Sequence, residues 1–261
     1  MNTTISRFNG VKTELLPDAD KTPGSRERLK IVFLNAWSGR LEEPFSAFLK
    51  QQAVDTDVFC FQEADGKVAE LCQVALKGFQ TISAYKRIGE TEDEFPQATY
   101  VRPDLQILAS RLLLSDQVDT GLGIDVEVPL GQGTARICNW HGVSRPVHKL
   151  DNPTRLKQSA ELIRSYEDVE GPVIIGGDFN VFPDTESIRT FSDNGYEDLI
   201  RRYNITNTRN RYAWERFPDT PQYYSDYVFA RGGLLVRQFT VPDTLISDHL
   251  PMILEVEERG D

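Results

Sequence analysis

Four short apolar segments of the chain lead into polar or charged clusters, and this placement constrains the fold more than any other feature. The clusters are Asn35, Gln62-Glu63, Gly177-Asp178-Phe179-Asn180 and Ser247-Asp248-His249. Apolar runs of four to eight residues are typical of buried strands. A polar side chain at a strand end stands on a rigid element and faces solvent, which is the placement that catalytic groups need. We therefore expect these clusters to contribute to a functional site.

Taken one at a time, each cluster has an ordinary structural explanation. Glu63 alone predicts a solvated carboxylate at a strand end. Asp178 and Asn180 alone predict an Asx turn, because Gly176-Gly177 precedes them. His249 alone predicts a hydrogen-bonded histidine of the core or surface. The functional interpretation depends on these side chains lying together.

The remaining pattern predicts many strands with helices among them. Helices are expected from Pro44, over Val68–Leu76, and after Asn152, which is a good N-cap before Pro153. Strands are expected over Leu29–Asn35, Asp57–Glu63, Gln106–Ala109, Leu112–Val118, Ile124–Val128, Thr134–His141, Pro172–Gly177, Asp226–Ala230, Leu235–Val241 and Met252–Val256, with a loop-rich stretch near 192–224. This number of strands predicts two sheets packed face to face with helices outside, although the pattern alone leaves the topology open.

Composition limits the class of protein. The chain has 261 residues with 29 Lys and Arg against 40 Asp and Glu, a net charge of −11. Such a charge repels polyanions at long range and argues against a sequence-independent nucleic-acid coat protein, but it is compatible with an acidic cleft that holds divalent cations. Three cysteines without paired spacing predict neither a disulfide framework nor a zinc knuckle, which favours a reducing compartment.

The chain reads as one domain behind a polar N-terminal segment. Residues 1–28 are interrupted by Pro17, Pro23 and Gly24 and predict a flexible leader, whereas 29–261 contains no linker or repeat and predicts a single catalytic domain. No apolar run has the length of a membrane span or the place of a signal-peptide core. We expect a cytoplasmic protein, and a monomer.

In their order along the chain, the polar clusters resemble the endonuclease/exonuclease/phosphatase superfamily, which includes deoxyribonuclease I. The matching positions are Asn35, Gln62-Glu63, Gly177-Asp178-Phe179-Asn180, Asp226 and Ser247-Asp248-His249. The resemblance implies an α/β (α+β) four-layer sandwich of two mainly antiparallel sheets. His141, ahead of the helix start Arg155–Gln158, is similar to the histidine-containing branches rather than to the exonuclease III branch, which usually carries tyrosine.

The resemblance and the chemistry of the side chains together imply a role for each position. Glu63 is a hard oxygen ligand suited to Mg²⁺, with Mn²⁺ as a substitute, and the resemblance adds Asn35 and Asp248 near that ion. Asp178 would accept a proton from the attacking water or orient it, and Asn180 would fix that water or a phosphoryl oxygen. His141 and His249 would donate hydrogen bonds to the phosphoryl oxygens, with Asp226 orienting His249.

These roles predict a divalent-metal-dependent hydrolase of phosphate esters, and the substrate is open. Arg209, Arg211 and Trp214 favour a phosphodiesterase or nuclease, with His148 as a further substrate-binding candidate, so a nucleic acid is one candidate partner. The net acidity favours a phosphatase or phospholipase-type enzyme on a small phosphorylated molecule or lipid headgroup. So does Tyr224-Ser225-Asp226-Tyr227, which lacks the arginine of the similar nuclease motif Arg-Ile-Asp-Tyr. A catalytically silent binding scaffold is the third alternative.

Overall fold

A computed structural model of the chain describes residues 4–8, 11–15, 26–88, 94–216 and 218–259, and it contains two β-sheets. The strands of the first sheet, in spatial order, are β1 (Thr4–Phe8), β2 (Val11–Leu15), β5 (Gln80–Ala84), β6 (Gln97–Val101), β4 (Val58–Gln62), β3 (Arg28–Asn35), β14 (Met252–Glu258) and β13 (Leu234–Thr240). Those of the second sheet are β11 (Glu197–Asp198), β12 (Asp226–Arg231), β10 (Val173–Asp178), β9 (Gly133–His141), β8 (Leu122–Leu130) and β7 (Ala109–Leu113).

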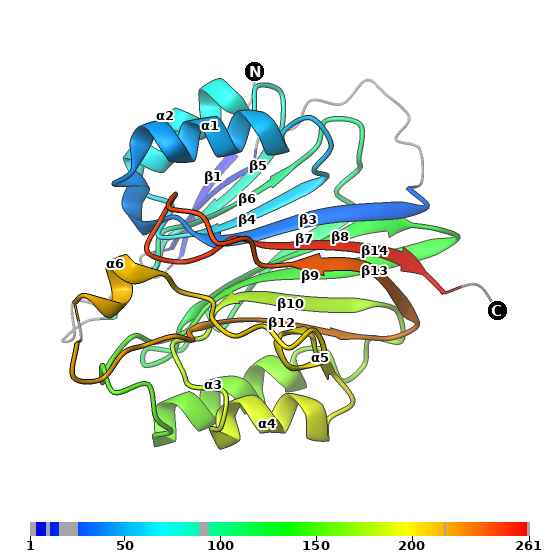
Figure 1. The fold of residues 1–261 in the computed structure, drawn as a ribbon. Helices are drawn as coiled ribbons and strands as arrows, with labels where there is room; N and C mark the ends of the chain where they lie inside the picture. The colour runs from blue at the N-terminus through cyan, green and yellow to red at the C-terminus, as the bar shows by residue number, and fades with distance from the viewer. Residues whose placement is uncertain (1–3, 9–10, 16–25, 89–93, 217, 260–261) are drawn as a thin grey trace.

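Helices cover the outer face of each sheet, so the molecule has four layers (Figure 1). Helices α1 (Glu42–Gln52) and α2 (Gly66–Ala75) lie over the first sheet, and α3 (Pro153–Arg164) and α4 (Glu186–Asp193) lie over the second. The short elements η1 (Trp37–Gly39), α5 (Leu199–Arg202) and α6 (Arg211–Trp214) lie in connections. The predicted four-layer sandwich is confirmed.

Each sheet contains one parallel pair of strands, β3 with β4 and β9 with β10, and its other pairs are antiparallel. Parallel neighbours end at the same edge of a sheet, so the register brings Asn35 opposite Gln62 and Asp178 opposite His141. The antiparallel strand β12 begins at this edge, with Asp226 opposite Asp178. The sheet topology therefore gathers polar residues from distant parts of the chain.

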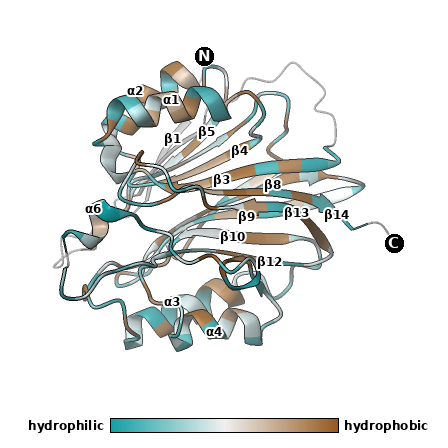
Figure 2. Cartoon of the chain, viewed as in Figure 1, coloured by the Kyte–Doolittle hydropathy of each residue, from teal (hydrophilic) through white to brown (hydrophobic). Residues whose placement is uncertain are grey.

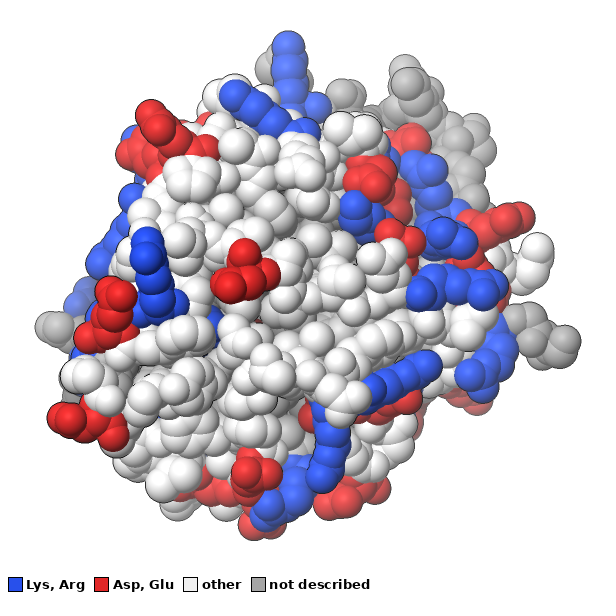
Figure 3. Space-filling model, viewed as in Figure 1, with Lys and Arg blue, Asp and Glu red and all other residues white. Residues whose placement is uncertain are grey.

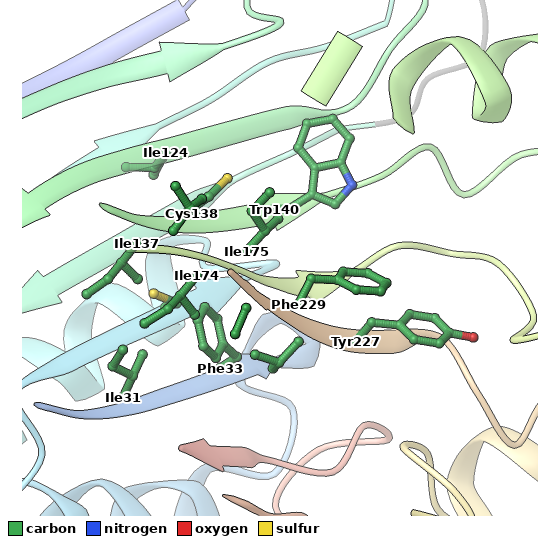
Figure 4. Packing of buried hydrophobic residues seen from close by; sticks show 14 of the residues in the cluster. Ile31, Phe33, Ile124, Ile137, Cys138, Trp140, Ile174, Ile175, Tyr227 and Phe229 are labelled. Atoms are coloured by element: carbon green, nitrogen blue, oxygen red, sulfur yellow. The ribbon is translucent and has the colours of Figure 1, made fainter. Parts of the chain in front are cut away.

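The main core lies between the two sheets. On β3, Ile31 and Phe33 face the other sheet, whereas Val32 and Leu34 pack under α1 and α2. Figure 4 shows Ile31 and Phe33 close to Ile174 of the second sheet. The strand is thus buried on both faces over Ile31–Leu34, which explains the uninterrupted apolar run at these positions. Figure 2 shows the same distribution, with apolar residues on the strands and hydrophilic residues on the outer faces of the helices.

Close packing and buried hydrogen bonds hold the sheets together beneath the polar edge. A Cβ atom at Gly176 would lie 2.7 Å from the ring of Phe33, so only glycine allows β10 this close to β3. The side chain of Gln62 donates a 2.6 Å hydrogen bond to Asn139 of the second sheet, and the Asn139 amide donates to the carbonyl of Phe61. These contacts fix the spacing between the strand ends that carry the polar clusters.

Most predicted elements are present, and two strand predictions are wrong. Residues 106–108 are not in a strand, because β7 begins only at Ala109. The strand predicted over Leu112–Val118 ends at Leu113, since Leu114 adopts a left-handed conformation and Val118 is 83% exposed. Strands β5 and β6 and helix α4 were not predicted. The loop-rich stretch near 192–224 contains the short elements β11, α5 and α6.

Strands β1 and β2 lie within residues 1–28, where the sequence predicted a flexible leader. They pair with each other, and β2 extends the first sheet by pairing with β5. The flexible leader over 1–28 and the start of the catalytic domain at residue 29 both stay predictions. Within the described residues, no helix combines the length and apolar character needed to cross a membrane. All three cysteines are buried and free.

Candidate active site

The predicted polar residues converge on one cleft at the edge where β3, β4, β9 and β10 end, near α6 in Figure 1. The cleft has a volume of about 250 Å³. Its lining includes Glu63, His141, Asp178, Asn180, Arg209, Asp248 and His249 from the predicted set. Asn35 and Asp226 do not line the cleft but are hydrogen-bonded to residues that do: Asn35 to Glu63 and Asp178, and Asp226 to His249. Side chains from both sheets thus face a common space.

Asp178 occupies the centre of the site and is 2% exposed. Its Oδ2 atom accepts a 3.0 Å hydrogen bond from the Asn35 amide, and its Oδ1 atom accepts from the Asn180 backbone N–H and from the Ser225 hydroxyl. Burial raises the pKa of Asp178, but the neighbouring His249 and Lys149 outweigh it and hold the pKa well below its usual range. Asp178 is therefore an ionised hydrogen-bond acceptor at neutral pH.

His249 and Asp226 form a buried pair. The Nδ1 atom of His249 lies 2.9 Å from each carboxylate oxygen of Asp226. Burial lowers the pKa of His249, but the Asp226 carboxylate outweighs it, so the pKa lies above its ordinary value. The Nε2 atom is 3.8 Å from Asp178 Oδ2 and 3.8 Å from Asp248 Oδ1, and therefore points towards the cleft. This geometry suits a protonated histidine that donates to an oxygen of the substrate.

His141 is the second histidine of the cleft, and its environment is different. Its ring packs edge-on against Phe95 with 5.1 Å between the ring centroids, and its Nε2 atom lies 4.0 Å from Asp178 Oδ2. Burial lowers the pKa of His141, and the carboxylates of Asp178 and Glu63 oppose this only in part. His141 is therefore a neutral donor beside the charged His249.

The oxygen donors of the cleft fit a hard divalent cation. Glu63 is half-buried, and Asp248 Oδ1 is buried without a hydrogen-bond partner among the described residues, so both carboxylates keep lone pairs available for an ion. Asp178, Asp226 and His249 form a second group whose ligand atoms lie within 4.8 Å of one another. In that group, however, Asp226 and the Nδ1 atom of His249 already bind each other. Metal binding by Glu63 and Asp248 stays a prediction.

Both polar atoms of the Asn35 amide form hydrogen bonds. Its Oδ1 atom accepts a hydrogen bond from the Trp37 N–H, and its Nδ2 atom donates to Glu63 Oε1 and to Asp178 Oδ2, each at 3.0 Å. The amide oxygen is therefore directed towards the backbone and away from the cleft. In this arrangement Asn35 positions the two carboxylates, and its role as a metal ligand stays a prediction.

Several site residues have left-handed backbone conformations that non-glycine residues seldom adopt. They are Trp37, Ser38, Glu63, Lys149 and Asn180, with φ between 48° and 59°. Such conformations cost roughly 1–3 kcal/mol each and persist where the surrounding structure imposes them. Five of the seven left-handed non-glycine residues in the described structure border or line this cleft, which marks it as the functional region.

The predicted substrate-binding residues separate into two groups. Arg209 lines the cleft and donates a 2.7 Å hydrogen bond to Asp248 Oδ2. Arg211 and Trp214 lie on α6 and do not line the cleft: Arg211 stacks on Tyr212, and Trp214 packs against Tyr223. His148 is exposed, and its Nδ1 atom accepts from the backbone N–H of Leu150. A substrate-binding role for these last three residues stays a prediction.

Other lining residues were not predicted from the sequence. They are Trp37, Arg40, Ser144, Val147, Lys149, Arg216 and Gln222. Lys149 is the most unexpected, because it is 5% exposed and donates to Asn180 Oδ1 and Ser225 Oγ. Burial lowers its pKa to about 8. The local sequence gives no sign of this burial, since Lys149 lies in a polar loop between exposed neighbours. Among these residues, only Trp37 could have been predicted to lie near the cleft, because it follows Asn35 by two residues.

Comparison with known families agrees with the geometry of the cleft. The sequence profile of the endonuclease/exonuclease/phosphatase family matches residues 32–249, which include every residue of the cleft. The chain belongs to this family. Comparison of the sequence with curated proteins yields no significant match. Membership in the family supports hydrolysis of phosphate esters as the activity, and the assignment to a histidine-containing branch stays a prediction.

Solved structures of the family share the fold at low sequence identity. An endonuclease/exonuclease/phosphatase from Bacteroides vulgatus has a TM-score of 0.69 and 17% identity, over 89% of this chain and 99% of that one. The catalytic domain of human Nocturnin, with a bound sulfate anion, has a TM-score of 0.64 and 16% identity over 89% and 95%. The mannosyl-6-phosphatase of Bacteroides thetaiotaomicron has a TM-score of 0.67 and 18% identity over 87% and 99%.

Proposed function

We propose that this protein is a divalent-metal-dependent hydrolase that acts on a small phosphate ester through in-line attack of water on phosphorus. The observation that carries the proposal is the meeting of Glu63, Asp178 and His249 in one cleft, although 186 positions separate the first from the last (249 minus 63). Family membership and the mannosyl-6-phosphatase among the structural neighbours support phosphate-ester hydrolysis.

Each side chain has a role that follows from its environment. Asp178 is ionised and rigidly held, so it accepts a hydrogen bond from the attacking water and fixes its direction. His249, kept protonated by Asp226, donates to an oxygen on which charge develops. Neutral His141 donates a further hydrogen bond from the opposite sheet edge. A Mg²⁺ ion at Glu63 and Asp248 would supply Lewis-acid stabilisation of the phosphoryl group.

A small substrate fits the dimensions and charge of the cleft. Its volume of about 250 Å³ is below the range of sites that enclose drug-sized ligands. Arg211 and Trp214, which favoured a nucleic acid, do not line it. On the face shown in Figure 3, acidic and basic residues are interspersed rather than gathered into a basic surface for a polyanion. We therefore place a small phosphorylated molecule ahead of a nucleic acid.

A nuclease is the second candidate, and one observation favours it. At the mouth of the cleft, the guanidinium carbons of Arg40 and Arg216 lie 5.0 and 5.9 Å from the centre of the Trp37 ring. An aromatic ring flanked by cations is a common means of binding a base and its neighbouring phosphates. The same group would also serve a small substrate with an aromatic or anionic leaving group.

A substrate panel tests the proposal and separates the candidates. The purified protein would be assayed with an aryl phosphomonoester, an aryl phosphodiester, sugar phosphates and a short single-stranded oligonucleotide, each with Mg²⁺, with Mn²⁺ and with chelator. We expect chelator-sensitive hydrolysis, fastest on the small esters. Faster cleavage of the oligonucleotide supports the nuclease, and activity that persists in chelator contradicts the metal-dependent mechanism. Metal binding without turnover of any substrate supports the scaffold alternative.

A further inference from the structure

Lys149 is a buried cation whose direct partners are neutral. Its ammonium group donates to Asn180 Oδ1 and to Ser225 Oγ, and no third acceptor is found among the described residues. The side chain is 5% exposed, and what exposure remains is towards the cleft that it lines. A lysine is rarely buried to this degree unless an opposite charge compensates it.

The carboxylates nearby do not remove this imbalance. Among the acidic groups, Asp178 has the largest electrostatic effect on the pKa of Lys149. Its two carboxylate oxygens, however, already accept hydrogen bonds from Asn35, Asn180 and Ser225. No ion pair joins Lys149 to a carboxylate in the part of the chain that the structure describes. The third N–H of the ammonium group is therefore available to an acceptor that enters the cleft.

The backbone shows that this position is imposed rather than incidental. Lys149 has φ of 56°, in the left-handed region that a long side chain avoids. Its carbonyl accepts a 2.8 Å hydrogen bond from Phe182 N–H, which ties the loop to the segment that carries Asn180. Glu63 and Asn180 share the left-handed conformation. The surrounding structure therefore imposes an unfavourable backbone conformation on Lys149, and this conformation places its ammonium group in the lining of the cleft.

We propose that Lys149 binds a non-bridging oxygen of the substrate phosphoryl group and forms, with His141 and His249, a site for a tetrahedral oxyanion. The proposal rests on the proposed function and adds a catalytic residue to it. Bound phosphate would supply the negative charge that the buried ammonium group lacks. The contacts to Asn180 and Ser225 would then aim the ammonium group and keep Asp178 beside the phosphorus.

Binding of inorganic phosphate tests this assignment independently of turnover. The full-length protein and its Lys149→Met and Lys149→Arg variants would be titrated calorimetrically with phosphate in the presence of saturating Mg²⁺. Methionine is an unbranched side chain one atom shorter than lysine, and it removes the charge. We expect Lys149→Met to weaken phosphate binding on the order of 10- to 100-fold, as for a lost charge-assisted hydrogen bond, and Lys149→Arg to restore part of the affinity.

Thermal unfolding and a matched variant separate binding from structure. Arg102, at the opposite end of β4 and β6, is another cation held by hydrogen bonds, in its case to the backbone carbonyls of Ala53 and Thr56. Arg102→Met should therefore lower the unfolding temperature without changing phosphate affinity. Phosphate should raise the unfolding temperature of the wild type and of Arg102→Met but hardly that of Lys149→Met.

Two results would overturn the assignment: phosphate affinity in Lys149→Met equal to that of the wild type, or a wild type that binds no phosphate. The outcome is distinct from that of the proposed function. If no ester is hydrolysed but phosphate binds in a Lys149-dependent manner, the oxyanion site stands and the hydrolase proposal fails. If esters are hydrolysed equally by the wild type and Lys149→Met with equal phosphate affinity, the hydrolase stands and the role of Lys149 fails.

Discussion

The Nδ1 atom of His249 lies 2.9 Å from both carboxylate oxygens of Asp226, and both side chains are buried. Asp226 begins β12 and His249 precedes β14, so the pair joins the polar edges of the two sheets. Burial raises the pKa of Asp226, and His249 opposes that shift. The pair therefore behaves as one unit in which the carboxylate fixes the tautomer and the charge of the histidine.

Replacement of this carboxylate should change the pH dependence of hydrolysis. The pKa of His249 is raised, so activity that needs its protonated form is present below that pKa and is lost as the pH rises through it. Asp226→Asn removes the main cause of the rise and should shift the basic limb of the kcat profile to lower pH. We expect kcat at neutral pH to fall about 100-fold or more. A basic limb at the wild-type position would contradict this role.

Glu63 should control the dependence on metal. Glu63→Gln keeps the hydrogen-bonding shape near Asn35 but weakens the ligand, so the Mg²⁺ concentration for half-maximal activity should rise at least about 10-fold. Glu70→Gln is the control, because Glu70 is an exposed residue of α2 that forms a surface ion pair with Lys67. Equal Mg²⁺ titrations for the wild type and Glu63→Gln would show that the metal is held elsewhere.

The close approach of the sheets at Gly176 should be visible in stability. Gly176→Ala places a Cβ atom 2.7 Å from the buried ring of Phe33, and we expect the free energy of unfolding to fall by about 1–3 kcal/mol. Gly66→Ala, at the start of α2, has no atom within 4 Å of the new Cβ and should be neutral or slightly stabilising. Denaturant unfolding of both variants measures the difference, and equal stabilities would contradict the packing described.

Lys86, which does not line the candidate active site, provides a test of how stability depends on pH. Its Nζ atom donates to the carbonyls of Leu114, Thr120 and Gly121, and burial lowers its pKa from 10.5 to about 8. The unfolded chain therefore binds the proton more tightly than the folded one between about pH 8 and 10.5. The free energy of unfolding should rise with pH across this window, and Lys86→Met should lack that rise.

Absolute stability at neutral pH gives a second readout for Lys86. Lys86→Met leaves three carbonyls without their donor, so it should lower the free energy of unfolding by about 2 kcal/mol or more at pH 7. Parallel pH profiles for the wild type and the variant would show that Lys86 keeps its ordinary affinity for the proton.

The sequence predicted those helices and strands whose local pattern of apolar and capping residues matches their burial in the folded protein. Strands β3 and β10 contain the buried apolar runs Ile31–Leu34 and Val173–Ile175. Asn152 does accept from Arg155 N–H as the N-cap of α3. Strand β6 was missed because its buried residues include the polar Gln97 and Thr99, whose hydrogen-bond partners Leu122 and Asn139 are distant in sequence.

The sequence predicted those residues of the candidate site that belong to the ordered polar motifs. Asp178 is the last residue of β10 and His249 shortly precedes β14, and the sheet topology brings these two strand ends together. Lys149 escaped prediction because its burial depends on contacts with Asn180 and Ser225, which lie 31 and 76 positions away. The direction of the Asn35 amide likewise depends on Trp37 N–H and on two carboxylates, which no spacing in the sequence reveals.

The catalytic rate of Asp178→Asn tests the central claim most directly, because Asp178 accepts hydrogen bonds from three segments of the chain and faces both histidines. The variant and the wild type would be compared on the best ester of the panel at saturating Mg²⁺, with thermal unfolding as the check on folding. We predict a fall in kcat of about 10²- to 10⁴-fold in a folded protein. A folded Asp178→Asn variant that hydrolyses the ester at the wild-type rate would contradict the account.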